Sequence, residues 1–182
     1  MSTYVALLRG VNVGKARRVP MADFRALLTE LGYTNVVTLL NSGNAVFQSS
    51  SKVKPDRLAA EIANAIARKL KVEVPVIVKS AQELAMISAE NALATTASDP
   101  SRLLVAFVQD TKALPGLAVI ESLVMPPEEF LLGKTAAYLH CTNGILQSRA
   151  GEALLGKVGK AATTRNWATV LKLQALVSNT DV

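Results

Sequence analysis

The first half of the chain alternates strand and helix patterns in an order that strongly limits its fold. Apolar runs typical of strands cover residues 3–8, 36–40, 44–48 and 74–79, and helical patterns cover 21–31 and 57–70. The second and third strands are joined through Asn41-Ser42-Gly43-Asn44, which favours a hairpin turn. The order βαββαβ predicts a ferredoxin-like split βαβ unit.

The second half repeats this order incompletely. Ser80 and Glu83 have the spacing of a capping box for a helix over residues 81–91. Beyond a turn-rich segment we expect a strand over 103–109, a helical or irregular segment over 112–124, a hairpin over 129–133 and 136–141, and helices over 149–158 and 165–177. This is βαββα with an extra helix.

We therefore predict an α+β fold of two ferredoxin-like halves, of which the second is irregular. Residues 1–93 form the N-terminal ferredoxin-like half. Residues 94–102 have turn composition and form a linker. Residues 103–182 form a C-terminal α+β half that ends in a helix pair.

Basic residues concentrate towards both ends of the chain. Residues 1–79 carry 12 Lys and Arg against 5 Asp and Glu, residues 80–148 carry 3 against 7, and residues 149–182 carry 5 against 2. Basic ends suggest an anionic partner, because Lys and Arg bind phosphate and carboxylate groups well. An ordinary solvated surface is the alternative explanation.

The sequence also predicts the cellular location of the protein. The single cysteine, Cys141, excludes an internal disulfide. No apolar run approaches the roughly 20 residues that cross a bilayer, and the N-terminus reaches Arg9 after too short an apolar segment for a signal peptide. We expect a cytoplasmic protein with no membrane partner; its oligomeric state is not predicted.

Topology predicts that two polar segments of the first half are neighbours. In a split βαβ unit the first two strands run parallel with the third between them. Loop 9–19 and turn 41–44 then emerge at the same edge of the sheet. Basic and amide side chains would meet there beside glycines that allow close backbone approach; they are Arg9, Asn12, Lys15, Arg17, Arg18, Asn41, Ser42 and Asn44.

Loop 9–19 does not match the common nucleotide-binding loops. Between Gly10 and Gly14 it has one residue too few for a Walker-type loop, and no Ser or Thr follows Lys15. The spacing of the glycines also excludes a dinucleotide fingerprint. What remains is a basic, glycine-containing loop, or a surface turn whose arginines cover apolar neighbours.

Residues 163–167 form a second candidate segment. Thr163 or Thr164 can cap the last helix, and Arg165 and Asn166 would then lie beside free first-turn amides, which attract anions. The alternative is a simple cap in which Trp167 anchors the helix in the core. Ser148 is the expected cap of the preceding helix.

Catalytic and metal-binding patterns are weak. His140 and Cys141 are adjacent on a predicted strand, so their side chains point to opposite faces. No other His or Cys is present, and we expect no metal site and no cofactor. Base stacking is disfavoured because the relevant strands offer only Tyr4 and Phe47, whereas sequence-independent contact with nucleic-acid phosphates stays open.

Three stretches resemble the signature of a bacterial family, domain of unknown function 1697. They are Arg9-Gly10-Val11-Asn12-Val13-Gly14 with Val19-Pro20-Met21, Leu40-Asn41-Ser42-Gly43-Asn44 with Val46-Phe47, and Thr163-Thr164-Arg165-Asn166-Trp167. The resemblance spans almost the whole chain and implies two ferredoxin-like halves. It implies no activity, cofactor or catalytic residue. Lys15 stands where many relatives are expected to have a second glycine.

We formulate three hypotheses. The first is a site for a small anionic, phosphate-bearing ligand, with the residues Arg9, Gly10, Asn12, Gly14, Lys15, Asn41, Ser42, Gly43, Asn44, Thr164, Arg165 and Asn166. The second is sequence-independent nucleic-acid binding by the basic N-terminal half. The third is that these motifs are purely structural and satisfy buried loop amides. Whether the protein is an enzyme is left undecided.

Overall fold

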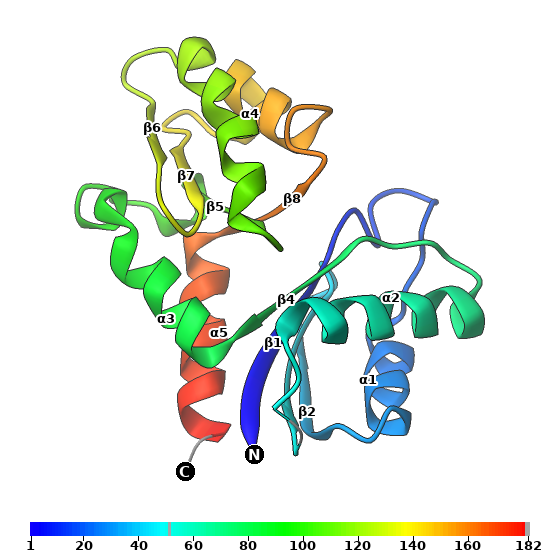
Figure 1. The fold of residues 1–182 in the computed structure, drawn as a ribbon. Helices are drawn as coiled ribbons and strands as arrows, with labels where there is room; N and C mark the ends of the chain where they lie inside the picture. Colours follow the sequence, from blue (N-terminus) through cyan, green and yellow to red (C-terminus); the bar gives the residue numbers. More distant parts are fainter. Residues whose placement is uncertain (51, 181–182) are drawn as a thin grey trace. The chain divides into compact units, whose positions relative to one another are not determined.

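The chain divides into two compact units, each of which is described by itself (Figure 1). The computed structural model describes residues 1–50 and 52–180. The first unit is Met1–Leu84 with Leu173–Val182, and the second is Ala85–Lys172.

Two helices contribute residues to both units. They are α3 (Ala81–Glu90) and α5 (Trp167–Thr180). The predicted linker, residues 94–102, falls within the second unit, where it includes the 3-10 helices η1 (Ala92–Thr95) and η2 (Pro100–Arg102). Its role as a linker stays a prediction.

The first unit has the predicted split βαβ topology. Its elements are β1 (Ser2–Leu8), α1 (Met21–Glu30), β2 (Thr34–Leu39), β3 (Asn44–Ser49), α2 (Pro55–Leu70) and β4 (Val76–Ser80). The sheet order is β2-β3-β1-β4, and every neighbouring pair is antiparallel. Strands β1 and β2 are therefore parallel, with β3 between them, as the sequence predicts.

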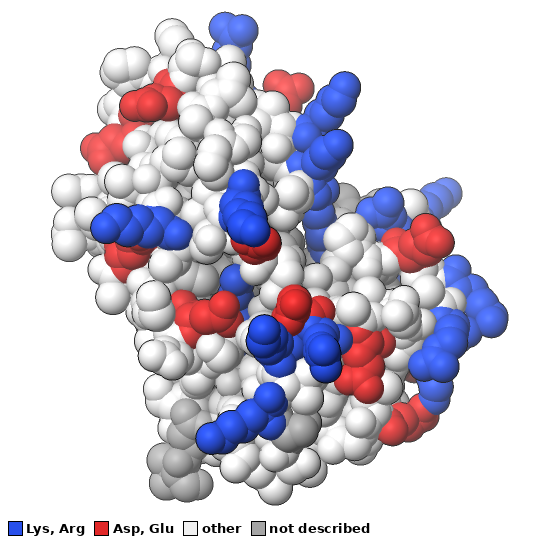
Figure 2. Space-filling view, viewed as in Figure 1, with Lys and Arg blue, Asp and Glu red and all other residues white. Residues whose placement is uncertain are grey.

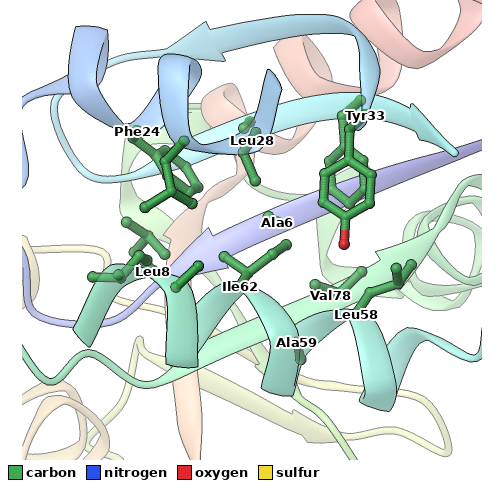
Figure 3. Packing of buried hydrophobic residues seen from close by; sticks show 14 of the residues in the cluster. Ala6, Leu8, Phe24, Leu28, Tyr33, Leu58, Ala59, Ile62 and Val78 are labelled. Carbon is green, nitrogen blue, oxygen red and sulfur yellow. The ribbon is translucent and has the colours of Figure 1, made fainter. Parts of the chain in front are cut away.

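Helices α1 and α2 pack against one face of this sheet (Figure 3). Alternate residues of β1, among them Ala6 and Leu8, contribute to this core because successive side chains of a strand point to opposite faces. Phe24 and Leu28 come from α1, and Ile62 comes from α2. All five side chains are fully buried. The core thus uses the helical periodicity that the sequence displays.

Residues that are typical of helix ends occur at the bounds of α1 and at the start of α3. Pro20 directly precedes α1, and Gly32, with a φ of 87°, follows it. The predicted capping box is confirmed at the start of α3. There the Ser80 N–H donates to the Glu83 carboxylate at 2.8 Å, and the Glu83 N–H donates to Ser80 Oγ at 3.1 Å.

The second unit repeats the topology of the first. Its elements are β5 (Leu103–Val108), η3 (Thr111–Leu123), β6 (Glu129–Leu132), β7 (Ala137–His140), η4 (Ile145–Gln147), α4 (Arg149–Leu155) and β8 (Ala162–Asn166). The sheet order is β6-β7-β5-β8, again antiparallel throughout. Ser148 caps α4 as expected, by accepting from the Gly151 N–H at 2.9 Å. The α+β fold with two halves is confirmed.

Strand β8 corrects the predicted order of the second half. Residues 162–166 pair with β5, so this half is a complete βαββαβ unit, and the last helix begins at Trp167 instead of residue 165. The short strand was missed because its sequence, Ala-Thr-Thr-Arg-Asn, is mostly polar. The only local signal for a strand is the β-branched pair Thr163-Thr164.

The irregularity of the second half lies in η3, a 3-10 helix. Pro115 sits inside it and has no N–H to donate to a helical hydrogen bond. Leu114, Leu117 and Ile120 are its buried residues. Their spacing of three residues matches the three residues per turn of a 3-10 helix and explains the weak helical pattern.

No helix in residues 1–50 and 52–180 is both long enough and apolar enough to cross a membrane.

Candidate functional site

The loop after β1 and the β2–β3 turn are neighbours, as the topology predicts. The Leu8 N–H donates to the Gly43 carbonyl at 2.8 Å, and Asn12 Nδ2 donates to the Asn41 carbonyl at 2.7 Å. The Arg9 N–H bonds to the Pro75 carbonyl at 3.0 Å, next to β4. The first part of the predicted site therefore forms one continuous surface of the first unit.

Asn12 holds this loop together from inside. Its Nδ2 also donates to the Val19 carbonyl at 2.8 Å, and its Oδ1 accepts from the Val19 N–H at 2.9 Å. Its own N–H donates to the Arg17 carbonyl at 3.1 Å. The Asn12 amide thus acts within the protein, as the structural hypothesis expects, and positions the loop for any ligand.

Asn44 and Gly43 have a comparable structural role in the turn. Asn44 is buried, and its Nδ2 donates to the Leu39 carbonyl at 2.8 Å and to Ser42 Oγ at 2.9 Å. Gly43 has a φ of 85°, and an added Cβ would lie 2.6 Å from the Cβ of Leu8. The turn therefore packs directly on the end of β1, and only glycine fits at this position.

The backbone of the loop alternates in a regular way. Positive φ values occur at Gly10 (65°), Asn12 (58°) and Gly14 (64°), whereas Val11 and Val13 keep negative values. Left-handed residues that alternate with right-handed or extended ones turn N–H groups towards a common side, which is the geometry of anion-binding backbone concavities.

The guanidinium group of Arg17 lies over the backbone at Gly10, and its charge acts on Arg9. Nη1 of Arg17 lies 3.6 Å from the position of a Cβ added to Gly10. The pKa of Arg9 is lowered from its ordinary value, first by burial and then by the charge of Arg17. Like charges this close repel each other, so an anion between them would relieve the repulsion.

The remaining cations of the loop are exposed to solvent. Lys15, Arg17 and Arg18 lie on the surface, and none of the described carboxylates is within salt-bridge distance of any of them. Figure 2 shows Lys and Arg side chains projecting where Figure 1 draws the blue loop after β1, with acidic groups nearby. Asn41 and Ser42 are exposed at the adjacent turn.

The predicted C-terminal part of the site belongs to the second unit. Arg165 lies in β8 and is only 8% exposed; its Nη1 donates to Thr163 Oγ1 at 3.0 Å and to the Thr164 carbonyl at 2.8 Å. Burial lowers the pKa of Arg165 to about 10. The contribution of Thr164, Arg165 and Asn166 to a ligand site stays a prediction.

The predicted cap of the last helix needs correction. Thr163 and Thr164 lie in β8, and Asn166 is the residue whose Oδ1 accepts from both the N–H and the hydroxyl of Thr169 at 2.9 Å. Because the helix starts two residues later than predicted, its first-turn amides lie beside Asn166 and not beside the threonines.

Other chemistry-bearing groups do not assemble into a second candidate. Among the residues that the structure describes, no three His, Cys, Asp or Glu side chains form a group that could hold a metal ion. Cys141 is fully buried, and burial raises the pKa of its thiol.

A hollow of about 840 Å³ lies away from this loop, beside β2. Arg25 is the only charged residue among the described residues that line it, so within this part of the chain it lacks the several cations of the loop. Tyr33 is also among the residues that line it. Burial and a 2.5 Å hydrogen bond to Glu61 raise the pKa of the Tyr33 phenol above its ordinary value. This hydroxyl is thus engaged by a neighbouring carboxylate.

Sequence reasoning missed the particular contribution of Arg17. It placed Arg17 among the cations near the turn but left it out of the ligand-binding set. No spacing rule could have shown that its guanidinium folds back over Gly10, since this depends on the left-handed backbone of Arg17 itself, whose φ is 51°. The run of basic residues after Gly14 was the available signal.

Fold and site together define the class: an α+β protein of two ferredoxin-like units with a basic loop after the first strand. The model of the family described as "Protein of unknown function (DUF1697)" matches residues 1–138, and the chain belongs to this family. The resemblance to this family is thereby confirmed; the match includes the first two motifs, and residues 163–167 lie outside it.

Solved structures support the same fold. The conserved bacterial protein SP0830 from Streptococcus pneumoniae is 25% identical to this chain, with a TM-score of 0.79. The match covers 97% of this chain and 98% of that chain. Among curated proteins, none matches this chain.

Proposed function

We propose that this cytoplasmic protein binds a small phosphate-bearing anion at the loop after β1 and the adjacent β2–β3 turn. The observation that carries the proposal is the position of the Arg17 guanidinium over Gly10, where its charge also lowers the pKa of Arg9. A guanidinium group above a backbone of alternating φ, with a second arginine near enough to feel its charge, is an arrangement that favours an anion.

Each part of the loop has a role in this proposal. Arg9, Arg17 and Lys15 supply charge, and the N–H groups near Gly10 and Gly14 supply hydrogen bonds at positions that a ligand can approach. Asn12 keeps the loop in this form through its bonds to Val19 and Asn41. The proposal is one of binding and assigns no reaction.

Nucleic-acid binding receives less support. Tyr4 and Phe47 are 4% and 0% exposed, and their rings stack on each other with centroids 5.7 Å apart. They therefore cannot serve as a platform for bases. Contact with nucleic-acid phosphates alone would be steeply salt-dependent, which separates it from a specific anion site.

Thermal unfolding with and without ligand tests the proposal. Phosphate and pyrophosphate at millimolar concentration should raise the Tm by roughly 2–5 °C over chloride of equal ionic strength. Arg17→Gln and Arg9→Gln should abolish the increase.

Arg25→Gln is the matched control, because Arg25 is an exposed cation of the same unit on α1. It should retain the increase in Tm. The proposal is wrong if neither anion raises the Tm, or if Arg17→Gln and Arg25→Gln respond alike.

A further inference from the structure

Two exposed apolar side chains lie in the two segments that form the candidate site. Val13, in the loop after β1, is 74% exposed, and Leu40, at the start of the turn, is 49% exposed. They are the chain neighbours of Asn12 and Asn41, which are joined by a 2.7 Å hydrogen bond. The two apolar groups therefore lie on adjacent loops that the protein holds together.

Exposed cations lie in the same loop as Val13. Lys15, Arg17 and Arg18 follow Val13 in this loop, and all three are exposed. None of the carboxylates in residues 1–50 and 52–180 lies within salt-bridge distance of them. The combination of projecting aliphatic groups with unneutralised cations is typical of surfaces that bind anionic bilayers.

The backbone of Leu40 is a second sign that its side chain has a use outside the fold. Its φ is 58°, a left-handed conformation in which Gly and Asn are favoured and Leu is rare. Leucine is therefore not the residue that this turn conformation favours, and about half of its side chain is exposed to water. Contact with an apolar phase would give this side chain a favourable environment.

We propose that this surface binds the anionic phospholipids of a membrane surface, with headgroup phosphates at the cations and with Val13 and Leu40 inserted at the interface. The inference rests on the proposed function, because the headgroup phosphate occupies the same anion site. It departs from the expectation, drawn from the sequence, of no membrane partner. A surface contact requires no spanning helix, since the cytoplasmic leaflet attracts basic segments by its negative charge.

The exposed aliphatic side chains of Val13 and Leu40 favour a lipid over nucleic acid, the other phosphate-rich partner. Single-stranded nucleic acids bind to aromatic platforms and to cations. Here the two rings of the sheet, Tyr4 and Phe47, are buried in the core, and the exposed groups at the site are aliphatic.

Sedimentation with vesicles tests the inference directly. Vesicles of phosphatidylcholine with about one third phosphatidylglycerol should bind the protein, and vesicles of pure phosphatidylcholine should not. The double variant Val13→Ser with Leu40→Asn should weaken partitioning by roughly tenfold, because it removes both apolar contacts and keeps every cation. Asn suits the left-handed backbone at residue 40, so the double variant should remain folded, as its Tm will show.

A control double variant, Val119→Ser with Leu171→Gln, removes exposed apolar side chains from the second unit. It should partition like the unchanged protein. Arg17→Gln should lose both vesicle binding and the pyrophosphate-induced rise in Tm. The Val13→Ser, Leu40→Asn variant should keep that rise.

The outcomes separate this inference from the proposed anion site. If pyrophosphate raises the Tm but anionic vesicles do not bind, the lipid inference is wrong and the anion site stands. Equal vesicle binding by the Val13→Ser, Leu40→Asn variant and by the control variant would also overturn the lipid inference. Tighter binding of the protein to a single-stranded oligonucleotide than to the vesicles would overturn it as well. If neither pyrophosphate nor vesicles bind, both proposals fail.

Discussion

The two units share one topology but differ at the connection between the first strand and the first helix. In the first unit this connection is residues 9–20, between β1 and α1. In the second unit it is only Gln109 and Asp110, and the Asp110 side chain caps η3 by accepting from the Lys112 N–H at 2.9 Å. The fold therefore does not require the long basic loop, and its length and charge need another explanation.

The hairpin turns of the two units are held in different ways. In the first unit, amide side chains of Asn12 and Asn44 bond to carbonyls of the loop and the turn. In the second, the Glu90 carboxylate accepts from the N–H groups of Lys134 and Thr135 at 2.6 and 3.1 Å. The turn of the first unit is thus held by amide side chains, whereas that of the second is held by a carboxylate.

The largest expected effect concerns the turn of the first unit. Gly43→Ala should lower the free energy of unfolding by about 3 kcal/mol, through left-handed strain and overlap of the new Cβ with Leu8 and Val11. Gly14→Ala is the control, because its φ is 64° and nothing lies within 4 Å of the added Cβ; it should cost only about 1 kcal/mol. Urea denaturation followed by circular dichroism measures both, and equal losses would contradict close packing at Gly43.

Asn12→Ala should have the next largest effect. It removes three side-chain hydrogen bonds, which should cost about 2 kcal/mol of unfolding free energy and expose the Val19 amide to exchange. In Asn41→Ala the main-chain carbonyl that accepts from Asn12 is retained, so this variant should change stability by less than about 0.5 kcal/mol. Hydrogen exchange at Val19 distinguishes the two; fast exchange in both, or in neither, would contradict the role of Asn12.

Glu90→Gln should have a smaller effect that depends on pH. Burial raises the pKa of Glu90, but hydrogen bonds from Thr135, Lys134 and Tyr138 outweigh it, so the pKa lies below its ordinary value. Since the folded pKa is the lower one, the stabilisation is complete above about pH 5 and is lost as the pH falls below about 4.

Glu90→Gln should lower the free energy of unfolding by about 1–2 kcal/mol near pH 7 and should make this free energy less dependent on pH. Urea denaturation followed by the fluorescence of Trp167, the single tryptophan, measures this in the second unit. Glu121→Gln changes an exposed carboxylate of the same unit and should leave the profile as it is. If Glu90→Gln lowers the free energy of unfolding by the same amount at pH 7 and at pH 4, the charge of Glu90 does not hold the turn.

Most of the fold could be predicted because its signals are local. Apolar periodicity, Pro20, Gly32 and the hairpin composition define the first unit, and the capping box defines α3. Strand β8 could not be predicted, because a polar five-residue segment acquires its strand character only by pairing with β5.

The candidate site was predictable only to the level of topology. Sheet order implies that the loop after β1 meets the β2–β3 turn, and Asn12 and Asn41 confirm it. The direction of each side chain depends on backbone conformations that no motif states. Asn12 therefore turned out to bond inside the loop, and Arg17 to lie over Gly10.

The composition of the first unit has a consequence for synthesis. Leu173 and Val177, both buried, belong to this unit, and Gln48 Nε2 donates to the Thr180 carbonyl at 2.9 Å. A ribosome reaches residue 173 only after it has made the whole of the second unit. The first unit therefore cannot be completed until residues 173–180 have been made, so it cannot fold fully before the second unit has been synthesised.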